Sequence, residues 1–211
     1  MNALAKRIHD LSVLDKARRV FGAKTHDYLG QKVASGDLEA LEARNQCRLP
    51  VDYRRFLEEI GTGVGPYYGL LSLSKVEEEL RMIEEDYQEA NAERATPGDS
   101  FGLERQVLAL KTLRTLDFPN LDCPDTRGGF IPICHHGCEF MTVLVVSGEC
   151  AGMVMDTTNF DSRPSHWFPA KCPPGIVEYA QQRKPISSFP NWPTFPDWID
   201  GWIRQGVQDL S

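Results

Sequence analysis

The densest apolar run of the chain, Phe140–Val146, is bounded on both sides by turn residues. Seven residues this apolar and this rich in valine are typical of a buried core strand. We expect Ile131–Cys134 and Ala151–Asp156 to be its neighbours. The connections of about four or five residues favour antiparallel hairpins, because a parallel crossover needs a dozen residues or more. The sequence therefore predicts an antiparallel three-stranded meander over about residues 130–157.

Amphipathic patterns predict helices before and after this meander. Apolar residues recur every three or four positions, while charged residues occupy the opposite face. The expected helices cover residues 3–21, 50–60, 73–92 and 195–203. Gly22 is suited to end the first of these helices, and Ser74 with Glu77 forms a capping-box pattern near the start of the third.

A further strand is expected over residues 67–73, after a glycine-rich turn at Gly61–Gly65. The predicted fold class is therefore α+β: a single domain with an antiparallel sheet flanked by helices. The sheet would consist of the central meander, about residues 130–157, and the strand at about 67–73. The remaining long segments are predicted to be mostly loops, with short ordered stretches near residues 103–116 and 176–183.

Length and composition are those of a globular chain. It has 211 residues, of which 41% are hydrophobic, enough for one domain with a proper core. No stretch approaches the roughly twenty apolar residues that cross a bilayer, and the N-terminal residues lack the apolar segment of a secretory signal. Without an export signal, the six cysteines are expected to be reduced thiols. These features predict a cytoplasmic protein with no membrane association.

The net charge of −7 is distributed unevenly. Residues 1–55 carry 11 basic and 7 acidic side chains, whereas residues 77–94 carry 8 acidic and 2 basic ones. Direct nucleic-acid binding needs clustered lysine and arginine, so this balance favours a basic protein partner instead. The predicted partner-binding residues are acidic positions of one helix, with two tyrosines as hot spots if they are exposed beside it: Glu77, Glu78, Glu84, Glu85, Asp86, Glu89, Tyr67 and Tyr68.

One cluster has the residue types of a metal or nucleophile site: Cys134, His135, His136 and Cys138. Thiolate and imidazole are good zinc ligands, and a cysteine beside a histidine can be a nucleophile. However, C-x3-C is not a usual zinc spacing, and catalytic cysteine–histidine pairs normally come from different elements. The pattern favours a strand end followed by a turn. We therefore expect no cofactor, and keep these residues as the alternative metal site.

Four motifs in order resemble the Smi/Knr family of the SUKH superfamily. Leu49–Leu57 is similar to that family's LP-x-D-Y-x-x-F-L helix, and it is followed by the glycine-rich turn. Pro66–Leu73 resembles the family's first strand, and Ile131–Cys138 its later strand and turn. Phe195–Trp202 resembles the closing aromatic helix. On this resemblance, residues 37–211 form the SUKH-like domain and residues 1–36 an N-terminal helical extension.

The resemblance also implies a function. Bacterial members are commonly immunity proteins that bind and neutralise a cognate toxin domain, often a nuclease, without catalysing a reaction. It implies a non-enzymatic protein whose partner is such a toxin, with a basic surface. Fungal relatives act in regulation, so a regulatory protein-interaction scaffold is one alternative. A small metal- or thiol-dependent enzyme built on Cys134–Cys138 is the other.

Overall fold

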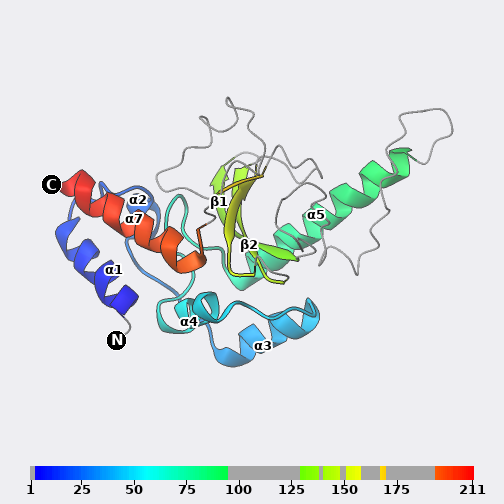
Figure 1. Ribbon diagram of the computed structural model, residues 1–211, viewed down its shortest axis with the longest axis horizontal. Coiled ribbons are helices and arrows are strands. Elements are labelled where there is room, and N and C mark those ends of the chain that lie inside the picture. Colours follow the sequence, from blue (N-terminus) through cyan, green and yellow to red (C-terminus); the bar gives the residue numbers. More distant parts are fainter. Residues whose placement is uncertain (1–2, 95–128, 138–139, 148–150, 158–166, 170–192) are drawn as a thin grey trace.

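The computed structural model describes residues 3–94, 129–137, 140–147, 151–157, 167–169 and 193–211. Its helices are α1 (Ala3–Leu14), α2 (Ala23–His26), α3 (Ser35–Arg44), α4 (Val51–Glu59), α5 (Leu73–Arg94) and α7 (Phe195–Leu210). Its strands are β1 (Phe130–Gly137), β2 (Phe140–Val145), β3 (Val154–Thr157) and β4 (Trp167–Pro169). The sheet lies centrally, with α1 beside α7 at one end, α3 and α4 on one flank, and α5 extending outward from the sheet (Figure 1).

The described strands form one antiparallel sheet in the order β1-β2-β3-β4. Leu144 is paired with Ile131 on one side and with Val154 on the other. This register confirms the predicted α+β class and its meander. The strand β4 was not predicted, because it lies in a segment expected to be loop. The segment 103–116 and the predicted helix at 176–183 lie outside the described residues.

The hydrophobic core lies between the sheet and the helices α1, α4 and α7. Its largest fully buried side chains come mainly from α4 and α7: Tyr53, Phe56, Leu57, Phe195, Trp198 and Trp202. The sheet contributes Ile131, Ile133, Leu144 and Val154. Because apolar residues three or four apart share one helix face, both helices present a continuous buried stripe to this core.

The helix α7 begins at a complete capping box. The Thr194 side chain accepts a hydrogen bond from the backbone N–H of Asp197, and the Asp197 carboxylate accepts one from the backbone of Thr194. Pro196 stands in the first turn, where its missing N–H costs nothing. The predicted inward residues Trp198, Ile199 and Trp202 are all buried, which confirms the expected face.

The first helix is shorter than predicted, because it ends at Leu14 rather than near residue 21. The reason is Asp15, which is fully buried. Its carboxylate accepts hydrogen bonds from the backbone N–H groups of Arg19 and Val20 and from the hydroxyl of Tyr28. A buried carboxylate that gathers three donors holds the chain in a turn instead of a helix.

Replacing Asp15 with alanine is expected to lower the free energy of unfolding by about 3 kcal/mol, since three donors lose a charged acceptor. Burial alone would raise the pKa of Asp15, but the bonds from Val20, Arg19 and Tyr28 outweigh it and lower the pKa below 3.8. The stabilisation should therefore be present above pH 3.8 and be lost as the pH falls through the lowered pKa. Urea unfolding of the wild type, Asp15→Ala and Asp15→Asn at several pH values measures the free energy of unfolding and its dependence on pH. An alanine variant as stable as the wild type would contradict it.

Two further sequence predictions need correction. The segment 67–73 is not a strand: Tyr67 and Tyr68 lie in a turn, and Leu70 forms a single antiparallel bridge with Cys134. The helix α5 begins at Leu73, and the hydroxyl of Ser72, not of Ser74, accepts the bond from the backbone N–H of Lys75 (3.3 Å).

Candidate functional site

The end of β1 holds the cysteine–histidine cluster, whose described members face different partners. Cys134 is fully buried, with its Sγ 3.4 Å from the carbonyl oxygen of Pro66. The ring of His135 reaches Glu79 of α5, with Nε2 2.9 Å from Oε1. Cys138 lies outside the described residues. Within the part of the chain that the structure describes, no three metal-ligating side chains converge.

His136 belongs to a buried polar network on the sheet. The hydroxyl of Thr142 donates to Asp156 Oδ1 (2.7 Å), so its oxygen accepts the bond from His136 Nε2 (2.6 Å). His136 therefore carries its proton on Nε2, and its Nδ1 is a bare acceptor. The side chain is only 4% exposed, and Nδ1 has no hydrogen-bond partner among the described residues.

Burial, with His135 beside it, lowers the pKa of His136 from 6.5 to about 3. Between these values the unfolded chain binds a proton here that the folded protein does not. We expect the free energy of unfolding to fall by about 1.4 kcal/mol per pH unit on acidification in this range. The pKa of His26 is also lowered, mainly by burial, so it contributes in the same direction.

Urea unfolding between about pH 7 and pH 4 measures this slope. His136→Phe should make this slope shallower, because it removes the titrating group. An unchanged slope in His136→Phe would show that His136 titrates alike in both states.

The two predicted tyrosines have different environments. Tyr67 is buried, 8% exposed, with its ring stacked on that of His136 at a centroid distance of 3.5 Å. Tyr68 is 55% exposed and passes close to Gly137 at the end of β1. Gly69 follows with φ +80°, and a Cβ there would overlap the carbonyl oxygen of Gly63. The glycine-rich turn thus holds Tyr68 outward and Tyr67 inward.

Three of the predicted acidic residues of α5 form ion pairs within the molecule. Glu77 pairs with Arg44 (2.6 Å), Glu78 with Lys75 (3.0 Å) and Glu85 with Arg81 (3.0 Å). These pairs are partly or largely exposed, and such pairs contribute at most about 1 kcal/mol each, so a partner's cations can compete for the carboxylates. Glu84, Asp86 and Glu89 belong to the same helix, and their side chains lie outside the described part of the structure.

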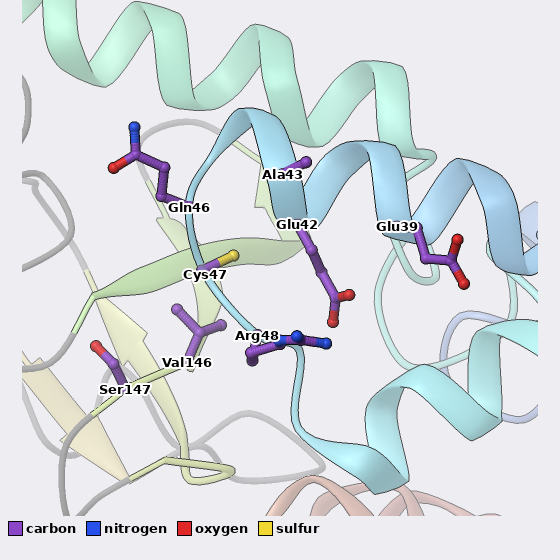
Figure 2. Close-up of a pocket in the computed structure, with 8 residues that line it drawn as sticks. All are labelled: Glu39, Glu42, Ala43, Gln46, Cys47, Arg48, Val146 and Ser147. Atoms are coloured by element: carbon purple, nitrogen blue, oxygen red, sulfur yellow. The ribbon is translucent and has the colours of Figure 1, made fainter.

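A cavity of about 610 Å³ opens between the end of α3 and the residues after β2 (Figure 2). Glu39, Glu42 and Ala43 line it from α3, while Cys47 and Arg48 belong to the following segment. The carboxylate of Glu42 stabilises the fold, because it accepts hydrogen bonds from the backbone N–H of Leu49 (2.8 Å) and from the side chain of Arg54 (2.9 Å). No histidine lines the cavity among the described residues.

A second hollow, of about 360 Å³, was missed by the sequence reasoning. We call it the basic pocket. It lies between residues 18–25, the glycine-rich turn and the end of β1, and its lining includes Arg18, Arg19, Phe21, Lys24, Tyr68 and His136. The available signal was the excess of basic residues in the first 55 positions, but only the fold brings them beside Tyr68.

The model of the SMI1 / KNR4 family (SUKH-1) matches residues 32–201. The match spans most of the chain, which therefore belongs to this family, as the motif order predicted. Membership is consistent with a toxin-neutralising immunity role, and proteins of this family are generally non-enzymatic. No curated protein and no solved structure gave a significant match. None of the described helices combines the length and apolarity needed to span a membrane.

Proposed function

We propose that this protein is an immunity protein, which binds a cognate protein toxin and neutralises it by occlusion. The observation that carries the proposal is the family match over residues 32–201, which includes the described sheet and the beginning of α7. The mechanism is steric and electrostatic: the bound protein covers the toxin's working surface and performs no chemistry on it. A cytoplasmic location suits this role.

The contact surface that we propose joins α5 to the end of β1. His135 binds Glu79 there, so the acidic helix and the turn that carries Tyr68 meet at the same place in the fold. The exposed ring of Tyr68 is suited to an interface hot spot, and the neighbouring Tyr67 is buried with its ring stacked on that of His136. Acidic charge along α5 would speed the encounter with a basic toxin surface such as that of a nuclease.

The first experiment is co-expression with the product of the neighbouring gene. The proposal predicts that the tagged protein rescues growth from that toxin and co-purifies with it in stoichiometric amount. Rescue should survive Cys134→Ser, because the thiol lies buried in the core. A partner that is bound but not toxic would favour the regulatory scaffold instead, and loss of rescue in a folded Cys134→Ser variant would favour a thiol enzyme.

A further inference from the structure

The basic pocket is locally cationic in an acidic protein. The chain as a whole carries a net charge of −7, yet no carboxylate lines this hollow among the described residues. Arg18 is held by Asp27 and by the carbonyl oxygen of Asp15. Arg19 and Lys24 are exposed, and neither forms an ion pair within the described part of the chain. The pocket therefore presents two cations that the described protein leaves unneutralised.

The walls of the pocket are fixed by long-range contacts. The indole N–H of Trp202 donates to the carbonyl oxygen of Phe21 (2.8 Å), and His26 Nε2 lies 2.7 Å from the carbonyl oxygen of Gly65. At Gly22 the two walls approach so closely that a Cβ would stand 2.7 Å from the same oxygen of Gly65. Because the surrounding backbone is held in place before binding, little conformational entropy would be lost when a ligand enters.

The aromatic and polar lining adds to the positive charge. The side chain of Phe21 is 36% exposed and that of Tyr68 is 55% exposed. Aromatic side chains of this kind are enriched at binding interfaces. His136 lies in the wall with its Nδ1 buried, so its ring closes the hollow without offering an accessible acceptor. A group that complements this lining carries a negative charge beside chain atoms that can pack on aromatic rings. A peptide segment with an aspartate or glutamate side chain has both.

We infer that the basic pocket receives an acidic segment of the partner protein, with Arg19 and Lys24 binding its carboxylates and Phe21 and Tyr68 packing against the chain beside them. The inference rests on the proposed function for the class of partner. Tyr68 then stands between two surfaces of opposite sign, the acidic helix α5 and the basic pocket. A surface with both signs accepts a partner in one orientation, because reversing the partner brings like charges together.

The test uses pentaglutamate as the probe, with no toxin present. A negative result would therefore overturn the inference about the basic pocket without bearing on the proposed immunity function. Amide chemical shifts of the ¹⁵N-labelled full chain are followed during titration, with pentaglutamine and inorganic phosphate as comparison ligands. Saturable shifts are expected at residues around the pocket. They should be much smaller with pentaglutamine, because the carboxylates carry the attraction.

The decisive variants are two double charge reversals that change the net charge equally. Arg19→Glu with Lys24→Glu should raise the dissociation constant for pentaglutamate by about tenfold or more. Lys32→Glu with Arg55→Glu, at exposed positions outside the basic pocket, should leave it within about twofold, since distant exposed charges are screened. Equal weakening by both pairs, absence of saturable shifts at the pocket, or equal affinity for phosphate would overturn the inference.

Discussion

Replacing Trp202 with alanine is expected to lower the free energy of unfolding by about 3–5 kcal/mol, a large share of the stability of a single domain. The side chain is 1% exposed and lies in the core face of α7, with its ring 5.8 Å from that of His26 and 6.0 Å from that of Tyr28. Truncation would leave a cavity and also free the carbonyl oxygen of Phe21. Chemical denaturation monitored by far-UV circular dichroism measures the loss.

Two matched variants separate the causes. Trp202→Phe keeps an aromatic ring but removes the N–H donor to Phe21, so about 1–2 kcal/mol should be lost. Val207→Ala removes an apolar side chain from the exposed face of the same helix, where it is 42% exposed, and should change stability by less than about 0.5 kcal/mol. If Trp202→Ala were no worse than Val207→Ala, the packing of α7 described here would be wrong.

Reversing three charges on α5 is expected to slow association with the toxin by about tenfold or more at low salt. The variant is Glu84→Lys, Glu85→Lys and Asp86→Lys, in the second half of α5. On the proposed interface, acidic residues there would steer a basic partner from a distance, so their reversal should mainly lower the association rate and flatten its dependence on ionic strength. Stopped-flow binding at several salt concentrations measures both.

The matched control carries the same change in net charge elsewhere: Asp10→Lys, Glu59→Lys and Asp209→Lys, all at exposed positions of α1, α4 and α7. Its association rate should fall much less, because these residues lie on other helices. Equal slowing by both triple variants would show an effect of net charge alone, and an unchanged rate in the α5 variant would remove that helix from the interface.

Local patterns predicted the meander and the closing helix well. The apolar run of β2 and the period of Trp198, Ile199 and Trp202 are strong because one buried face determines each of them. Boundaries were predicted less well. Helix α1 ends at Leu14 because Asp15 is bonded to groups up to thirteen residues away, and no periodicity carries that information. The segment 67–73 was predicted to be a strand, but the glycine-rich backbone around it holds Tyr67 and Tyr68 in a turn.

The candidate site was less accessible from the sequence, because it depends on contacts between distant segments. The acidic stretch 77–94 was visible as a charge imbalance, whereas its pairing with Arg44 and His135 was not. The basic pocket requires Arg19 and Lys24 to meet Tyr68 and His136, more than forty residues later in the chain. Only the packing of α2, α7 and the glycine-rich turn brings them together.

The most direct test of the proposed immunity function is a titration of the purified toxin's activity with this purified protein. Occlusion predicts that residual activity falls linearly and reaches zero at one equivalent, that the toxin's mass is unchanged, and that activity returns when the complex is dissociated. Complete inactivation by far less than one equivalent, or a lasting change in the toxin's mass, would mean that the protein acts as an enzyme. Undiminished activity at excess would mean that this toxin is not neutralised by binding.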